Sequence, residues 1–180
     1  MLSRKTAFRA FAAICLIAAL LFAPLPWQST TRIHSEVTIQ RSPAEVFEYV
    51  STPANWPAWH PSALAVQGAT DHSLRVGEQV IEAYRVADRE GIVVWTVTGR
   101  QAPSFWRIDG TIEGRNAGTV TYTLTPSGTG TRFEREFTYQ APTLLFSIIN
   151  WATLRKQIDA ESTAALQQLK ARLDGGAKAD

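Results

Sequence analysis

The chain has 180 residues, of which 45% are hydrophobic and 19% charged, and its formal net charge is +2. This composition excludes a chain that is disordered throughout, because it supplies enough apolar surface for the core of one domain. Three of the 18 basic residues and none of the 16 acidic ones lie in residues 1–31. The rest of the chain is therefore close to neutral, and without a basic surface to follow phosphates no nucleic-acid partner is expected.

Cysteine and histidine are scarce. Cys15 is the only cysteine, which excludes an internal disulfide and a cysteine-based zinc site. The three histidines, His34, His60 and His72, lack the spacing of metal ligands. The sequence also lacks a nucleophile elbow, a P-loop and the glycine pattern of dinucleotide-binding folds. We therefore expect neither a cofactor nor a metal.

Residues 1–31 have the layout of a secretory signal or a signal anchor. Arg4, Lys5 and Arg9 precede an apolar run over residues 10–23, and Pro24–Trp27 follow it. A cationic start before a short apolar stretch is typical of export signals. The run is at the short end of what a bilayer requires of a transmembrane helix.

Two fates of this segment remain open. If it is cleaved, the best small-residue site follows Ala23, but Pro24 lies directly beyond the cut, and the domain would be exported. If it is retained, residues 10–27 form a single-pass anchor in the cytoplasmic membrane, with Trp27 at the far interface. The positive-inside rule then places residues 1–9 in the cytoplasm and the domain on the non-cytoplasmic, periplasmic side. We favour the anchor over cleavage, and over a buried core helix, which three cations and no acid disfavour.

The domain opens with a predicted strand and a capped helix. Alternating apolar and polar residues predict a strand over residues 32–40. Ser42 is a good N-cap, Pro43 suits the first helical position, and Glu45 completes a capping box. We expect this helix to end before Pro53.

A proline-rich segment then places two indoles and an imidazole close together. Residues 55–61 contain Trp56, Trp59 and His60, and the prolines among and before them exclude a long helix. A short turn is expected here. Its indoles either close one end of the domain's interior or line an entrance to it.

The remaining sequence predicts strands followed by one long helix. Strands are expected over residues 63–67, 78–87, 92–100, 105–113, 118–125 and 131–140, with hairpin turns at 88–91 and 126–130. Residues 142–173 contain no internal proline or glycine and predict a helix that ends before Gly175 and Gly176. The last residues, 175–180, are expected to form a disordered tail.

This order predicts an α+β domain in which a seven-stranded antiparallel sheet wraps around the C-terminal helix. Residues 37–66, VTIQRSPAEVFEYVSTPANWPAWHPSALAV, resemble the opening of the polyketide cyclase/dehydrase branch of the START/Bet v 1-like (SRPBCC) superfamily. The resemblance extends over about residues 32–173. It implies the helix-grip fold, with an apolar cavity between sheet and helix, in a START-like ligand-binding domain at residues 32–174. The superfamily contains lipid binders, carriers and a few cyclases, so it does not by itself decide an activity.

Strand alternation indicates which side chains face such a cavity. The predicted ligand-binding residues are Trp56, Trp59, His60, Tyr84, Trp95, Trp106, Tyr122, Phe133, Arg135, Phe137, Ile148 and Trp151.

Three ionisable residues are candidates for catalysis: His60, Glu82 and Arg135. Glu82 and Arg135 fall in the inward phase of their strands, where unpaired charges would be costly. Together they either form an ion pair at the cavity mouth or orient a polar ligand group, and the planar fork of Arg135 suits a carboxylate or enolate. His60 could exchange a proton near neutral pH.

These residues support two main hypotheses. In the first, a membrane-tethered or exported binding protein holds a hydrophobic small molecule or lipid in its cavity. In the second, a cyclase/dehydrase-like enzyme uses Tyr84 and the three ionisable candidates to move protons or stabilise an enolate. The second requires at least two of those polar groups to converge inside the cavity. A third hypothesis, an interaction module that uses the outer face of the sheet, has no specific support.

Overall fold

The computed structural model describes residues 4–175 and contains one seven-stranded antiparallel sheet in the order β1-β7-β6-β5-β4-β3-β2. Its strands are β1 (Pro24–Ile39), β2 (Ala63–Gly68), β3 (Gln79–Val86), β4 (Arg89–Gln101), β5 (Phe105–Ile112), β6 (Arg115–Ser127) and β7 (Gly130–Thr143). Its helices are α1 (Arg4–Phe22), α2 (Pro43–Ser51), the 3₁₀ turn η1 (Pro53–Asn55), α3 (Trp56–Trp59), α4 (Leu144–Ile149), the π-helical turn η2 (Asn150–Leu154) and α5 (Arg155–Gly175).

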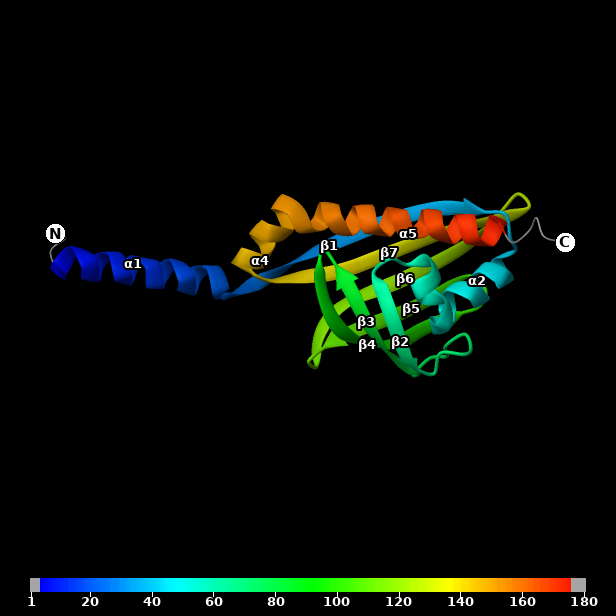
Figure 1. The fold of residues 1–180 in the computed structure, drawn as a ribbon, viewed down its shortest axis with the longest axis horizontal. Coiled ribbons are helices and arrows are strands. Elements are labelled where there is room, and N and C mark those ends of the chain that lie inside the picture. The colour runs from blue at the N-terminus through cyan, green and yellow to red at the C-terminus, as the bar shows by residue number, and fades with distance from the viewer. Residues whose placement is uncertain (1–3, 176–180) are drawn as a thin grey trace.

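The predicted helix-grip arrangement is confirmed. Figure 1 shows α5 running lengthwise over the sheet beside β1 and β7, with α2 at one end and α1 extending beyond the other. The predicted N-cap is also present, since the Ser42 side chain accepts from the Glu45 backbone while the Glu45 carboxylate accepts from the Ser42 backbone. This reciprocal cap fixes where the chain leaves β1 and enters α2.

The N-terminal part of the chain differs from the expectation. Helix α1 ends at Phe22, and β1 begins at Pro24 rather than at residue 32, because the backbone pairs antiparallel with the end of β7. The backbone of residues 24–27 therefore belongs to a strand, whereas the expected position of the Trp27 side chain at an interface lies outside the described side chains. Within residues 4–175, none of the helices combines the length and the apolar character needed to cross a membrane.

The first hairpin turn is also placed differently. The turn residues are Ala87 and Asp88, both with left-handed φ angles of 48° and 61°, whereas the expected turn spanned residues 88–91. Gly91 lies within β4 opposite Tyr84, where a Cβ atom would come within 2.6 Å of the Tyr84 hydroxyl oxygen. Glycine is thus required at residue 91 for the close approach of a ring and not for the turn.

The C-terminal helix is interrupted. Instead of one helix over residues 142–173, β7 continues to Thr143, and the π-helical turn η2 separates α4 from α5. A π turn places an extra residue in the turn, so it rotates the helix face that follows relative to the face before it. The tail expected at residues 175–180 lies outside the described residues except for Gly175, which ends α5.

The core is densest where α2, α3 and the second half of α5 meet the sheet. The largest side chains with less than 2% exposure include Trp59, Trp106, Phe47, Phe133, Leu166 and Leu169. The Trp106 ring stacks on Tyr122 at 5.3 Å and meets Trp56 edge-on at 6.2 Å. These rings belong to one buried core cluster, which packs this end of the domain.

Candidate functional site

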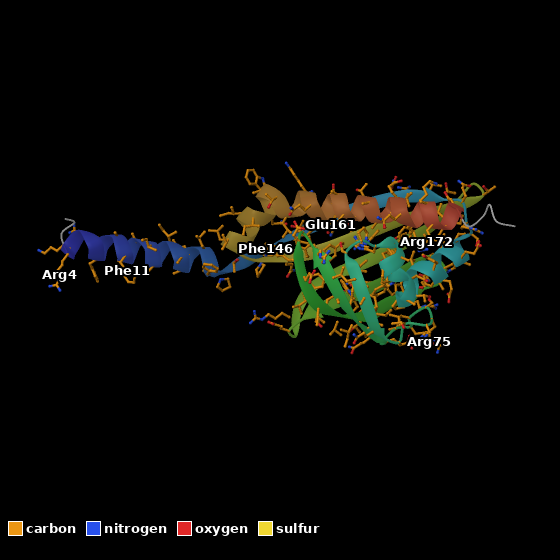
Figure 2. All side chains as sticks on the ribbon, viewed as in Figure 1. Arg4, Phe11, Arg75, Phe146, Glu161 and Arg172 are labelled. Carbon is orange, nitrogen blue, oxygen red and sulfur yellow. The ribbon has the colours of Figure 1, made fainter. Side chains whose placement is uncertain are left out.

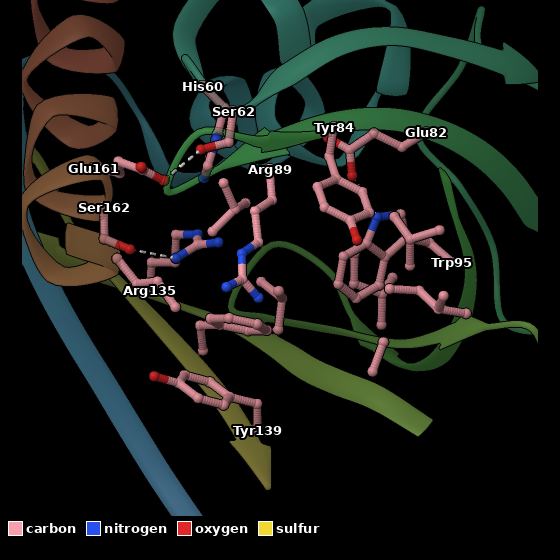
Figure 3. A pocket seen from close by; sticks show the side chains of 18 of the residues that line it. His60, Ser62, Glu82, Tyr84, Arg89, Trp95, Arg135, Tyr139, Glu161 and Ser162 are labelled. Carbon is pink, nitrogen blue, oxygen red and sulfur yellow. Dashed lines mark hydrogen bonds between the residues drawn. The ribbon is translucent and has the colours of Figure 1, made fainter. Parts of the chain in front are cut away.

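A cavity of about 390 Å³ lies between the sheet and the segment from α4 to α5. Most of the wall residues that strands β3 to β7 contribute lie at alternate positions, as the period of two in a strand predicts. Figure 3 shows side chains from the strands and from α5 directed into this space. Its apolar lining includes Trp56, Trp59, Tyr84, Val93, Trp95, Ile108, Ile112, Val120, Tyr122, Phe137, Tyr139, Phe146, Leu154 and Ile158.

The aromatic wall of β4 depends on a small residue on the next strand. Trp95 pairs with Gly110 on β5, and a Cβ atom at residue 110 would approach the indole to 2.7 Å. The ring can therefore lie flat against the sheet, and the space in front of it stays open. A larger residue at position 110 would push the indole into the cavity.

Arg135 is the most deeply buried charge in the cavity wall, with 7% of the residue exposed. Its Nη1 donates to the Ser162 hydroxyl at 2.9 Å, and its guanidinium lies 5.7 Å from the centre of the Phe137 ring. Its Nε is buried without a hydrogen-bond acceptor. Among the residues that the structure describes, no carboxylate forms an ion pair with it.

Glu82 is likewise buried, with 8% exposed, and accepts a hydrogen bond from Trp95 Nε1 at 2.5 Å. Burial raises the pKa of its carboxyl group to about 7, against the lowering effects of the Trp95 bond and the Arg135 charge. The anticipated direct ion pair between Glu82 and Arg135 is absent from the described contacts. Three strands separate β3 from β7 in the sheet, and each charge bonds to a nearer partner instead.

His60 lines the cavity. Both ring nitrogens are buried and lack a hydrogen-bond partner. Burial, assisted by the positive charge of Arg135, holds the pKa of the imidazole well below 6.5. The protonated ring would have no compensating acceptor, so this environment does not favour proton exchange by His60 near neutral pH, and its role in catalysis stays a prediction.

The polar side of the cavity contains residues that the sequence did not single out. Glu161 on α5 accepts from the Ser62 hydroxyl at 3.0 Å and from the Ala87 backbone N–H at 2.9 Å. Ser162 and Arg89 also line the space. Glu161 and Ser162 lie three and four residues after Ile158, so they share its face of α5. From the sequence, only apolar residues of the helix were expected at the wall, and both were therefore missed.

The structure places most of the predicted ligand-binding residues at the cavity wall: Trp56, Trp59, His60, Tyr84, Trp95, Tyr122, Arg135 and Phe137.

Four predicted ligand-binding residues do not line it. Trp106 and Phe133 face inward as expected, but both are 0% exposed and packed among other rings at the filled end of the domain. Ile148 and Trp151 are 48% and 83% exposed. Ile148 lies just before the π turn and Trp151 within it, and the neighbouring Phe146 and Leu154 line the cavity instead.

One cluster on the outer face of the sheet has ligand types that metals use. Potential ligand atoms of His34, Glu36 and Glu134 lie within 4.8 Å of one another. However, the Arg132 guanidinium pairs with Glu36 at 2.5 Å and with Glu134 at 3.2 Å. A cation of the chain thus already pairs with both carboxylates, and the cluster forms an exposed ion-pair network.

The fold and the cavity define a helix-grip protein with an internal binding space. The chain belongs to the family described as polyketide cyclase / dehydrase and lipid transport, whose model matches residues 30–174. A search of curated proteins found no match.

Several solved structures share the fold. Protein MLL2253 from Mesorhizobium loti is 17% identical with a TM-score of 0.59, covering 83% of this chain and 99% of its own. TTHA0849 from Thermus thermophilus is 12% identical with a TM-score of 0.64, covering 83% of this chain and 100% of its own. SA2116 from Staphylococcus aureus, a protein of unknown function, is 7% identical with a TM-score of 0.66, covering 84% and 98% respectively. At these identities the likeness extends to the fold alone.

Proposed function

We propose that this protein binds a hydrophobic small molecule or lipid in the cavity between its sheet and α5. The observation that carries the proposal is the cavity itself, about 390 Å³ of space walled mainly by aromatic and branched aliphatic side chains. Natural ligand sites have this size and composition, with a few polar groups that fix orientation. Burying the apolar part of a ligand there releases water from both surfaces, which is the main driving force for such binding.

Binding can be tested on the purified full chain with decanol as the probe. Trp56, Trp59 and Trp95 line the cavity, so decanol should change the intrinsic tryptophan fluorescence in a saturable way. Native mass spectrometry of the same preparation should show one decanol per chain. If neither a co-purified apolar molecule nor bound decanol is found, the proposal fails.

A cavity-filling substitution identifies where the probe binds. Ile112 lines the cavity and is only partly buried, so Ile112→Trp should fill part of the space with little strain and weaken decanol binding at least about fivefold. Ile81→Trp is the matched control, because Ile81 is 45% exposed and lies outside the cavity lining. Equal weakening by both variants would place the probe elsewhere.

A second candidate function is enzymatic, because several polar groups line this cavity. Glu82, Tyr84, His60 and Arg135 all line it, and a carboxyl group with a pKa of about 7 suits general acid–base catalysis at neutral pH. If Glu82 abstracts a proton next to a carbonyl, the full chain should accelerate deuterium exchange at the α-carbons of 2-decanone. Glu82→Gln should abolish the acceleration and still bind the ketone, whereas an exchange rate equal to that in buffer excludes this activity.

We further propose that α1 holds the domain at the cytoplasmic membrane, on its periplasmic side. Seven large apolar side chains of α1, from Phe8 to Phe22, are exposed, and Figure 2 shows α1 side chains directed outward along its length. Arg4, Lys5 and Arg9 precede the apolar run, as in a signal anchor. A second exposed apolar patch, formed by Leu144, Ile148 and Trp151, lies on α4 and η2 near the end of α1.

Membrane fractionation with N-terminal sequencing tests the tether. A membrane fraction that retains Met1 supports the anchor, and a soluble product beginning near Pro24 shows cleavage and export. Flotation of the full chain with anionic vesicles tests whether the patch of Leu144, Ile148 and Trp151 contacts the membrane. Trp151→Ser should reduce the fraction of protein bound to vesicles, whereas Ile81→Ser should not. Equal flotation of these two variants would exclude the patch from membrane contact.

A further inference from the structure

The cavity contains a buried positive charge that the protein itself does not neutralise. Arg135 is 7% exposed, donates through Nη1 to the neutral Ser162 hydroxyl, and keeps its Nε buried without an acceptor. A buried guanidinium without a partner anion is unfavourable, because burial removes part of the hydration that stabilises its charge. The wall is therefore incomplete at Arg135 in the absence of a ligand.

The two acidic groups that share the cavity are engaged elsewhere. Both oxygens of Glu161 accept hydrogen bonds, one from Ser62 and one from the Ala87 backbone. Glu82 accepts from Trp95 and makes no ion pair with Arg135 among the described contacts. The protein thus offers a hydrogen-bond donor at Arg135 without placing a carboxylate against it.

A second unsatisfied polar group lies in the same cavity. Both ring nitrogens of His60 are buried and unpartnered, and the neutral ring carries one N–H donor. Arg89, at the exposed start of β4, also lines the cavity, and Figure 3 shows its guanidinium directed into it. Three donor side chains, two of them positively charged, therefore line the cavity, while both of its carboxylates are already hydrogen-bonded.

We propose that the ligand is an amphiphilic anion whose carboxylate is bound by Arg135 and His60 while its apolar part occupies the aromatic-walled cavity. A carboxylate supplies the acceptor that Nε lacks, and a guanidinium binds it with paired, charge-assisted hydrogen bonds. This inference rests on the proposed function, because it specifies the class of hydrophobic molecule that the cavity binds.

The test compares two probes with the same tail, decanoate and decanol, on the full chain at pH 7.5. Decanoate should bind at least about tenfold more tightly, as expected for one charge-assisted interaction in a water-poor site. Arg135→Met keeps the apolar stem and removes the charge, so it should lower decanoate affinity to that of decanol and leave decanol affinity within about threefold. Arg132→Met is the matched control, because Arg132 lies on the exposed face of the same strand and should leave the preference intact.

The outcomes separate the two proposals. Equal or stronger binding of decanol by the unaltered chain overturns the anionic-ligand inference and leaves hydrophobic binding standing. Binding of neither probe overturns the proposed function itself. Should Arg135→Met fail to fold, the comparison of the two probes on the unaltered chain and on Arg135→Lys still decides, since lysine should retain part of the preference.

Discussion

The two ends of the interface between the sheet and α5 are built from the same strands and the same helix, yet one is solid and the other hollow. At the solid end, Trp106 and Phe133 belong to the same buried core cluster as Leu166 and Leu169. At the hollow end, strand β7, which also contains Phe133, presents Arg135 and Phe137 to the cavity. Strand alternation thus determines whether a side chain points toward α5. It does not determine whether that side chain packs against another one or borders the cavity.

The two ends differ in the polarity of the α5 residues that face the sheet. Its second half faces the sheet with Ala165, Leu166 and Leu169, which are all buried in the core. Its first half presents Glu161 and Ser162 to the cavity instead. Polar side chains on an inward helical face therefore mark where apolar packing stops and where a ligand's polar group can be received.

The sharpest test of this comparison uses two phenylalanines on one strand. Phe133 is 0% exposed in the solid core, so Phe133→Ala should lower the free energy of unfolding by about 3–5 kcal/mol. Phe137 faces the cavity and already lacks neighbours on one side, so Phe137→Ala should cost only about 1–2 kcal/mol. Urea unfolding of both variants gives the two values, and equal losses would mean that the hollow end is packed.

Glu82 should make stability fall as pH rises. Its pKa is raised from 4.5 to about 7 in the folded chain, so between these values the folded state binds a proton that the unfolded state has released. Stability is then lost between about pH 4.5 and pH 7, by on the order of 2–3 kcal/mol. Glu82→Gln should remove this loss in urea unfolding at pH 5 and pH 8, while Glu48→Gln on the exposed side of α2 should not. An unchanged pH profile in Glu82→Gln would show that the carboxyl is not desolvated.

His60 should act in the opposite direction. Its pKa lies well below 6.5 in the folded chain, so below pH 6.5 the unfolded state binds a proton that the folded state does not. Stability is therefore lost as pH falls below 6.5. His60→Gln cannot be protonated and should be less sensitive to acid than the unaltered chain in unfolding experiments between pH 5 and pH 7.5. His34→Gln on the exposed outer face provides the control, and identical sensitivity in all three proteins would contradict burial of the imidazole.

The smallest effect on the free energy of unfolding is expected at Trp151, which was predicted to line the cavity but is exposed. Trp151 is 83% exposed, so Trp151→Ser should change the free energy of unfolding by less than about 0.5 kcal/mol. Trp106→Ala, by contrast, removes a fully buried ring and should cost about 3–5 kcal/mol. A large loss in Trp151→Ser would indicate that η2 packs against another part of the chain.

Much of the fold and part of the site could be predicted from local patterns. The Ser42 capping box and the strand alternation depend on neighbours within a few residues, and both predictions are confirmed. The same alternation correctly turned Glu82 and Arg135 inward. The π turn at residues 150–154 has no comparable local signal, so Ile148, just before it, and Trp151, within it, were wrongly expected at the cavity wall.

The amino-acid sequence by itself determined the element order, the inward phase of each strand and the family to which the chain belongs, because periodicity and caps are short-range properties. Only the tertiary structure decided that Trp106 and Phe133 fill the core while Trp95 and Tyr84 border a void, and that the charges of Glu82 and Arg135 do not meet. Those outcomes depend on the curvature of the sheet, on the glycines beneath the rings and on the rotation of α5. All three of these features involve residues distant in sequence.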